Sequence, residues 1–286
     1  MPGLRVAIVG ACLRDGTGGS PTAVLDEAPI GDEQRRRVPG LAGTSHAVFV
    51  SAPGGPEGGP VSLRFFTSEG ELPACGHGTV AALAFLAARN GGERYRTTLH
   101  ASGRVFGGWS LWDGTEADAA FEPGPVTLRE PPRAEYEDVL AALGVPAHAP
   151  APGAAIASVG RPRLLLPLAT KHDLAALAPD FDRLRTACDR LGLLGCYVHS
   201  VPEPTGRVAA RMFAPSIGVP EDIANANSTA CLAAHLAGRG TTRIAVDMGD
   251  SLGSPATITA TTRPGPAGPL IRLGGTARLL RVLRLP

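Results

Sequence analysis

The segment that most constrains this fold is an apolar run behind a glycine-rich start. Residues 80–88 read VAALAFLAA, follow directly on Cys75-Gly76-His77-Gly78-Thr79, and lead to a glycine pair at 91–92. A helix that is apolar on every side has to be buried on every side, so the rest of the chain must enclose it. Its first turn carries unpaired N–H groups and a partial positive charge. We therefore expect a buried helix from about residue 76 whose start binds a carboxylate.

Two glycines and two reactive side chains lie at this helix start. Gly76 and Gly78 would let a ligand approach the backbone closely, and Thr79 would add a further donor. Cys75 would have a lowered thiol pKa there, although it is equally well interpreted as a small, inert residue. The positive helix end favours the neutral form of His77, which suits a proton acceptor.

The second half of the chain repeats this pattern. Residues 211–240 again give a strand ending in Phe, a Pro/Gly turn and an apolar helix that ends at glycine. At an offset of 150, residues 75–79 fall on Asn225-Ala226-Asn227-Ser228-Thr229. A duplicated unit of this kind predicts two similar lobes whose helix starts face each other across a cleft.

Composition excludes several classes of function. A net charge of +1 over 286 residues gives no reason to expect nucleic acid or a membrane as a partner. None of the five cysteines forms a CxxC pair, which is typical of reduced thiols in a cytoplasm. No secretion signal or membrane-length apolar run is present. We expect a soluble cytoplasmic protein with a small-molecule carboxylate substrate. The sequence does not decide whether it forms a homodimer.

Short strands separated by turns surround each buried helix, which predicts an α+β fold with antiparallel sheets. Residues 145–153, VPAHAPAPG, have the composition of a linker. This places a first lobe at 1–145 and a second lobe at 154–286, with its central helix from about residue 228. The final strands of the second lobe could pack back onto the first lobe.

Several stretches, in order, resemble a known family. They are GGSPTAV at 18–24, TSHAVFV at 44–50, FFTSEGELPACGHGTVAA at 65–82, MFAPSIGVPEDIANANSTACLAAHL at 212–236, GSPATI at 253–258 and LGGTA at 273–277. This set is similar to the PhzF-like proteins of the diaminopimelate epimerase-like superfamily. The resemblance implies two pseudo-symmetric lobes, each a mixed β-barrel around a central helix, with the active site between them. It also implies proton transfer at carbon without a cofactor.

The chain departs from the family pattern at four positions. His46 stands where PhzF-like proteins carry the Glu that acts as acid and base. Glu221-Asp222 is kept, but Ala226-Asn227 replaces the family's Gly-Ser. Racemase and epimerase relatives use one cysteine at each helix start; Cys75 matches the first, whereas Asn225 occupies the second, which excludes a two-cysteine racemase at these positions.

The candidate catalytic residues are therefore His46, Cys75, His77 and Asp222. His46 is the natural base because an unperturbed imidazole titrates near neutral pH, although a surface histidine at a strand start would look the same. Asp222 either orients another catalytic group or titrates itself, and a purely structural helix cap is the alternative. Gly76, Gly78, Thr79, Asn225, Asn227 and Ser228 are candidates for substrate binding. No short-range spacing of His and Cys indicates a metal site.

Three functions fit these residues. The first is a cofactor-independent isomerase that shifts a proton and a double bond on an amino-acid-derived carboxylate, in secondary metabolism such as antibiotic biosynthesis. The second is a single-cysteine amino-acid epimerase or hydroxyproline-type dehydratase. The third is a catalytically silent binding protein, which the loss of the family's Glu would favour.

Overall fold

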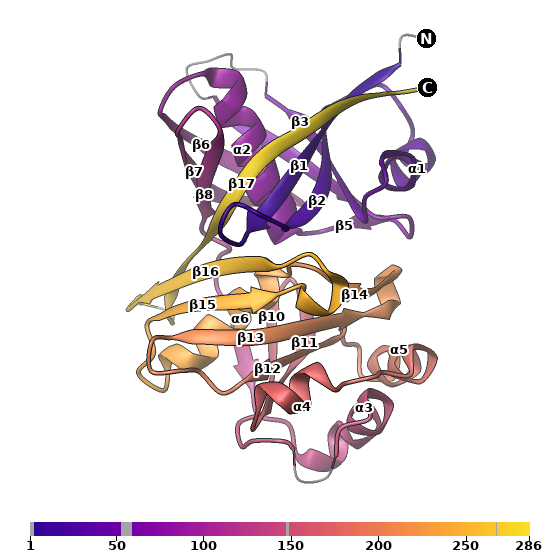
Figure 1. Ribbon diagram of the computed structural model, residues 1–286, viewed down its shortest axis with the longest axis vertical. Coiled ribbons are helices and arrows are strands. Elements are labelled where there is room, and N and C mark those ends of the chain that lie inside the picture. The colour runs from indigo at the N-terminus through magenta and orange to yellow at the C-terminus, as the bar shows by residue number, and fades with distance from the viewer. Residues whose placement is uncertain (1–2, 53–58, 147–148, 267) are drawn as a thin grey trace.

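The computed structural model describes residues 3–52, 59–146, 149–266 and 268–286. The chain forms two lobes stacked along the long axis of the molecule, and both termini lie at the far end of the first lobe (Figure 1).

The first lobe contains most of the N-terminal half of the chain. Its elements are β1 (Leu4–Leu13), β2 (Ser20–Asp26), α1 (Asp32–Ala42), β3 (His46–Ser51), β4 (Val61–Phe66), β5 (Glu71–Leu72), α2 (Gly76–Asn90), β6 (Arg94–Ala101), β7 (Arg104–Trp112) and β8 (Glu116–Phe121).

The second lobe contains the rest, apart from part of the last strand. Its elements are β9 (Thr127–Arg129), α3 (Glu137–Leu143), β10 (Ala155–Val159), β11 (Arg161–Leu168), α4 (Lys171–Ala175), α5 (Phe181–Arg190), β12 (Cys196–Ser200), β13 (Arg207–Ala214), β14 (Val219–Asp222), α6 (Ala226–Ala237), β15 (Arg243–Met248), β16 (Ala256–Arg263) and β17 (Leu270–Leu285).

Strand pairing shows that the two lobes share one plan. In the first, β2 is parallel to β3, β3 is antiparallel to β4, and β4 is antiparallel to β5 and parallel to β6. In the second, β11, β12, β13, β14 and β15 repeat these relations in the same order. The expectation of antiparallel sheets is therefore wrong: parallel pairs arise because helices connect β2 to β3 and β11 to β12. The resulting sheets are mixed.

The central helices α2 and α6 form the core of their lobes. Alanine predominates along both, and its small side chain lets strands pack closely on every face of each helix. Gly91, with φ of +70°, ends α2 in the left-handed conformation that glycine adopts most easily. The second helix begins at Ala226, two residues before the predicted start. Further helices cover the outside: α1 packs on β1–β4, and α3 and α5 pack on β10–β13.

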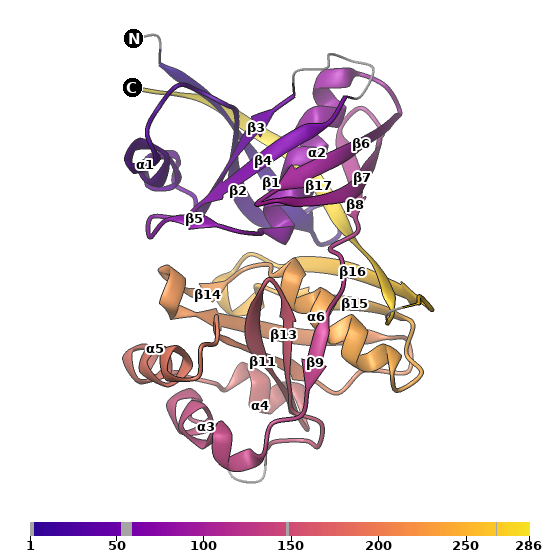
Figure 2. The same cartoon turned by 180° about the vertical axis from the view of Figure 1, so that it is seen from behind.

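The chain passes between the lobes earlier than its composition indicates. β9 pairs with β10, and α3 packs against α5, so residues 127–143 lie with the second lobe. Figure 2 shows this passage as the segment between β8 and β9. The expected boundary at 145–153, of which residues 147–148 lie outside the described part of the chain, is therefore displaced, because a proline-rich segment before β10 has the composition of a linker.

The last strand joins both lobes. β17 begins beside β16, continues along β8, and then pairs with β1 up to Leu4↔Leu285 (Figure 1). The core is correspondingly continuous, since α2 and α6 belong to one cluster of buried apolar side chains.

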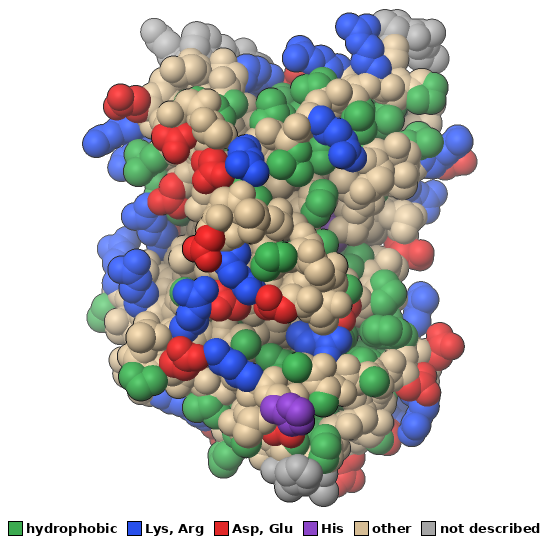
Figure 3. Space-filling model, in the orientation of Figure 1, with side chains coloured by type: hydrophobic (Ala, Val, Ile, Leu, Met, Phe, Trp, Pro, Cys, Tyr) green, Lys and Arg blue, Asp and Glu red, His purple; other side chains and the backbone are tan. Residues whose placement is uncertain are grey.

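Charges of both signs are interspersed on the face drawn in Figure 3, in keeping with the small net charge. Ion pairs such as Arg14–Asp250 and Arg207–Asp247 account for several of the exposed charged groups. None of the helices described is long and apolar enough to cross a membrane.

Candidate active site

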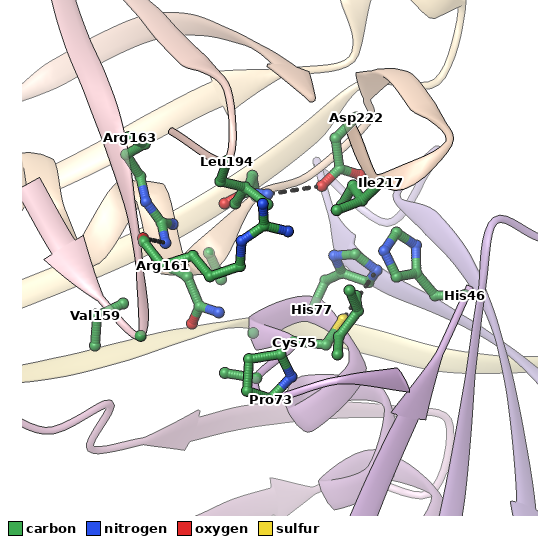
Figure 4. A pocket seen from close by; sticks show the side chains of 17 residues that line it. His46, Pro73, Cys75, His77, Val159, Arg161, Arg163, Leu194, Ile217 and Asp222 are labelled. Carbon is green, nitrogen blue, oxygen red and sulfur yellow. Dashed lines mark hydrogen bonds between the residues drawn. The ribbon is translucent and has the colours of Figure 1, made fainter. Parts of the chain in front are cut away.

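A pocket lies where the starts of α2 and α6 meet. Cys75 to His77 line it from the first lobe, and Asn225 to Asn227 line it from the second. Two further side chains come from strand ends: His46 is the first residue of β3, and Asp222 is the last residue of β14 (Figure 4). The structure thus brings the four candidate catalytic residues into one cavity between the lobes.

The two helix starts correspond but are capped differently. Cys75 and Asn225 are the N-cap residues, and 225 − 75 = 150 is the offset expected from the sequence repeat. The Asn225 side chain accepts a hydrogen bond from the Ser228 amide at 2.9 Å, as an N-cap side chain ordinarily does. Cys75 makes no such bond, so its thiol remains available to the pocket.

The glycines serve helix packing as well as ligand approach. A Cβ on Gly76 would lie 2.5 Å from the Ala226 Cβ, so α2 and α6 meet here at a distance that only glycine allows. A Cβ on Gly78 would lie 2.9 Å from the Cys75 sulfur and 3.0 Å from Val48. The expectation that both glycines simply open the backbone to a ligand is therefore incomplete for Gly76 and wrong for Gly78.

Three candidate binding residues lie behind the pocket wall. Thr79 is buried, and its amide and hydroxyl both donate to the Cys75 carbonyl oxygen. Ser228 is also buried and, like Gly78, does not line the pocket. Gly76, Asn225 and Asn227 do line it. The amides left for a ligand are therefore those of residues 76–77 and 226–227.

His46, Cys75 and His77 form a compact buried cluster. The two imidazole centroids are 4.4 Å apart with their planes at 86°, and the Cys75 Sγ lies 3.5 Å from His77 Nε2. His77 Nδ1 donates to the Ala224 carbonyl oxygen at 2.7 Å, which directs Nε2 towards the thiol. His46 Nδ1 lies 2.9 Å from the Ser45 hydroxyl. His46 is only 2% exposed, so the alternative of a surface histidine is wrong.

The environment moves the two histidine pKa values in opposite directions. Burial, together with the charge of His77, holds the pKa of His46 well below its ordinary value. Burial alone would also lower the pKa of His77, but Cys75 and Asp222 outweigh it and raise that pKa to about 9. The expectations of a near-neutral pKa for His46 and of a neutral His77 are both wrong, because burial and neighbouring charges outweigh the helix dipole.

Asp222 faces this cluster from the second lobe. Burial raises the pKa of its carboxyl group, although the positive charge of His77 opposes the rise. Its Oδ2 accepts a hydrogen bond from Asn225 Nδ2 at 2.9 Å. Asn225, not Asp222, caps α6, so the structural alternative proposed for Asp222 is wrong in that form. Asp222 orients the capping residue and adds a carboxyl group to the pocket.

The same cluster has the donor atoms of a metal site. One ligand atom from each of His46, Cys75 and His77 lies within 4.8 Å of the others. Nitrogen and sulfur donors of this kind suit Zn²⁺ and other transition metals. The sequence expectation of no ligand set fails here, because His46 reaches the other two through the fold and not through short-range spacing.

Two charged residues of the pocket were missed from the sequence. Arg161 and Arg163, both on β11, contribute their side chains to the cavity wall (Figure 4). The signal that could have found them is the segment RPRLLLPL, in which an arginine stands inside a buried apolar strand. Arginine is almost never fully buried without a partner, so its presence in such a run is informative.

Comparisons with known proteins agree with this architecture. The family model for phenazine biosynthesis-like proteins matches residues 13–281. A protein from Deinococcus radiodurans named an uncharacterized isomerase is 30% identical over 280 residues, with 93% of this chain and 89% of that protein covered. One from Salmonella typhimurium, also named an uncharacterized isomerase, is 26% identical, with coverages of 85% and 84%.

Solved structures share the fold along its full length. A protein described as a predicted epimerase from Pseudomonas aeruginosa has a TM-score of 0.82 at 23% identity, covering 99% of both chains. A PhzF-family protein from Bacillus anthracis has a TM-score of 0.83 at 16% identity, covering 100% of both.

A hydroxyproline epimerase from Agrobacterium vitis, solved with trans-4-hydroxy-L-proline, has a TM-score of 0.62 at 10% identity and covers 99% of this chain and 92% of its own. The predicted α+β, diaminopimelate epimerase-like fold is confirmed by these matches. With a family model covering nearly all of its length, the chain belongs to the phenazine biosynthesis-like protein family.

Proposed function

We propose that this protein is an isomerase that moves a proton, and with it a double bond, on a small amino-acid-derived carboxylate, without a cofactor. The relatives named isomerases support the reaction class. The family's description supports a place in secondary metabolism, including antibiotic biosynthesis. The pocket supports proton transfer because its wall carries an imidazole base, an imidazole acid, a thiol and a carboxyl group.

The observation that carries the proposal is the contrast between two neighbouring histidines. At neutral pH His46 is uncharged, and His77, whose pKa is raised to about 9, holds its proton. Their rings are 4.4 Å apart in one cavity. A free base beside a charged acid is the combination that an allylic proton shift requires, since one group removes a proton while the other supplies one.

The reaction then balances without an added reagent. His46 takes a proton from the carbon acid, and the electron pair of that C–H bond enters the conjugated system. The developing negative charge is stabilised by cationic His77 and by the amides at the helix starts. His77 or Cys75 returns a proton at the new carbon. The proton taken up by His46 then passes to His77, and on to Cys75 where the thiol was the donor, which restores the starting state.

The substrate carboxylate is assigned to the helix starts. The amides of residues 76–77 and 226–227 are the first donors of α2 and α6, and the helix dipoles add positive potential there. The side chain of Asn227 lines the same space and cannot exchange protons, so it is assigned to binding. This arrangement holds the carboxylate next to the acid–base cluster.

A single-cysteine epimerase or hydroxyproline-type dehydratase is the second candidate. Its support is the structural likeness to the hydroxyproline epimerase together with Cys75 at the α2 start. Asp222, on the opposite lobe, would act as the second proton carrier, because Asn225 cannot. A silent binding protein is the third; it would keep the cavity and use none of these groups for chemistry.

Deuterium exchange separates these functions. The protein is incubated in heavy water with trans-4-hydroxy-L-proline, proline and cyclic dienyl amino acids, and the products are followed by NMR. A moved double bond with deuterium at the new carbon supports the isomerase. Deuterium at Cα with inverted configuration indicates the epimerase, and loss of water the dehydratase. Absence of label with every compound that binds would overturn the enzyme proposals.

A further inference from the structure

Arg163 is a buried cation without an anion. Its side chain is 1% exposed, and no carboxylate among the described residues lies within ion-pair distance of it. One terminal nitrogen donates to the Ser228 hydroxyl at 3.1 Å, and the other donates to the Arg161 carbonyl oxygen at 2.7 Å. The third donor, Nε, is buried and has no acceptor. Both of its acceptors are neutral, so the charge is hydrogen-bonded but not compensated.

A second guanidinium lies next to it. Arg161 is two positions earlier on β11, so both side chains point to the same face of the strand. Arg161 is half-buried, extends across the cavity, and pairs with no acidic side chain in the described part of the chain (Figure 4). The two like charges line the same cavity, and their repulsion lowers the pKa of Arg163 further after burial.

This arrangement is costly unless something anionic completes it. An uncompensated charge in a protein interior is strongly destabilising, and most buried charges are paired for that reason. The other well-buried arginines of this chain follow the rule: Arg35 pairs with Glu27, and Arg211 pairs with Glu221 through two hydrogen bonds. Arg163 is the exception among these three, and it lines the pocket.

We propose that Arg161 and Arg163 form a subsite for a second acidic group of the substrate, which is therefore a diacid. One carboxylate lies at the helix starts beside His46 and His77, as in the proposed function on which this inference rests. The other acidic group accepts hydrogen bonds from Arg163 Nε and the Arg161 guanidinium. A carboxylate and a phosphate or phosphonate share the required chemistry, since guanidinium groups bind both through paired donors.

The position of the subsite separates recognition from chemistry. Arg161 and Arg163 come from β11 of the second lobe, whereas His46, Cys75 and His77 come from the first. A diacid would therefore touch both lobes at once, and its distal group would set the orientation of the reacting carbon. Binding energy from a remote group of this kind positions the substrate for reaction.

Binding measurements test the subsite without requiring turnover. Glutarate, pentanoate and 4-phosphonobutyrate are titrated into the protein by calorimetry at constant ionic strength. Glutarate and pentanoate have the same chain length and differ only in the second carboxylate. We expect glutarate to bind at least tenfold more tightly than pentanoate, and the phosphonate arm to show which acidic group is preferred. Equal affinities, or no detectable binding of glutarate, would overturn the subsite.

Two variants locate the effect. Arg161→Gln keeps a half-buried polar side chain, so it should fold normally and should lose the preference for glutarate. Arg163→Met removes the uncompensated charge; we expect its ligand-free Tm to be no lower than that of the wild type, while stabilisation by glutarate disappears. A purely structural Arg163 predicts the opposite, a lowered Tm with glutarate stabilisation intact.

A matched control variant tests the subsite, and failure of the subsite can be distinguished from failure of the proposed function. Arg272→Gln removes a cation that stacks on Trp109, away from this pocket, and should retain the glutarate preference. Failure of the reaction proposal would show as absence of deuterium exchange while diacid selectivity is kept. Failure of the subsite would show as exchange that proceeds equally well with monoacid and diacid substrates.

Discussion

His46 and His77 lie with their ring centroids 4.4 Å apart and their planes at 86°, although 31 residues separate them in the chain (77 − 46). The strand start of β3 supplies one ring and the first turn of α2 supplies the other. Because both are buried, the charge of one directly affects the protonation of the other. Their opposite protonation states at neutral pH follow from burial and the charge of His77, which lower the pKa of His46, and from Cys75 and Asp222, which raise the pKa of His77.

Replacing His46 tests its part in proton transfer. General acid–base groups contribute on the order of 10² to 10⁴ in rate, so we expect His46→Gln to lower kcat by about that factor. His46→Glu should recover part of the loss, since it restores a titratable group at this position. Heavy-water exchange rates provide the measurement. Near wild-type turnover in His46→Gln would leave the Cys75–His77 pair as the working groups.

The repeat in the sequence was enough to predict two similar lobes around buried helices and to bring the two helix starts together, whereas the mixed sheets were implied only by the family resemblance. The offset of 150 between Cys75 and Asn225 matches the observed N-caps, and the apolar runs are the buried central helices. Such features are local, since they depend on periodicity and capping within one segment.

What the sequence could not give depends on burial and on long-range contact. The pKa of His46 is set by surroundings that form only when β3 packs against α2. The unusual position of Arg163 becomes evident only in the folded structure, where its Nε is buried without an acceptor. The boundary near residue 145 failed for a similar reason: composition marks loops, but only the pairing of β9 with β10 shows to which lobe the segment belongs.

Stability should fall in acid because of His199. Burial, with the charges of His235 and Arg239, lowers its pKa in the folded state to about 4. Between pH 6.5, the ordinary histidine pKa, and pH 4, this histidine is protonated in the unfolded chain but not in the folded protein. The contribution of His199 to stability is therefore complete above about pH 6.5 and is lost as the pH falls, by on the order of 3 kcal/mol.

Urea unfolding at several pH values measures this loss. His199→Gln should flatten the dependence between pH 6.5 and 4 while leaving a buried polar side chain in place. His172→Gln serves as the control, since His172 is exposed. An equally steep fall in the His199→Gln variant would contradict the assignment and point to other groups.

Zinc should bind to the histidine–cysteine cluster and inhibit. Ordinary Zn–S and Zn–N bond lengths place the two donor atoms about 3.5 Å apart in a tetrahedral site, and Cys75 Sγ and His77 Nε2 are separated by 3.5 Å. Binding releases the thiol proton to solvent and occupies the acid–base groups. We expect chelator-treated protein to keep its activity and added Zn²⁺ to remove it.

Cobalt substitution provides a direct readout of the zinc site. Co²⁺ bound to Cys75 should give a sulfur-to-metal charge-transfer band that Cys75→Ser loses, whereas Cys231→Ser, on a buried helix away from the cluster, should keep it. Inhibition by Zn²⁺ that persists in Cys75→Ser would place the metal elsewhere.

Cys75 should react with iodoacetamide before the other cysteines. All five are buried, but Cys75 lines the pocket. Burial raises the pKa of Cys12, Cys188, Cys196 and Cys231, which reduces their reactive thiolate. Peptide mapping after brief treatment measures the order, and glutarate should protect Cys75. Earlier labelling of Cys188 or Cys12 would contradict this prediction.

The contact between the helix starts should be recoverable by exchanging two small residues. Gly76→Ala places a Cβ 2.5 Å from that of Ala226, and overpacking of this kind costs about 1–3 kcal/mol. Ala226→Gly alone should cost roughly 0.5–1 kcal/mol, because glycine weakens the helix. In the double variant the second change makes room for the first, so urea unfolding should show a loss smaller than the sum of the single losses. Proton-exchange activity should follow the same pattern, since Gly76 and Ala226 both line the pocket. Strictly additive losses would mean that the two helix starts do not depend on each other. The close contact between Gly76 and Ala226 would then not be what holds the starts of α2 and α6 together.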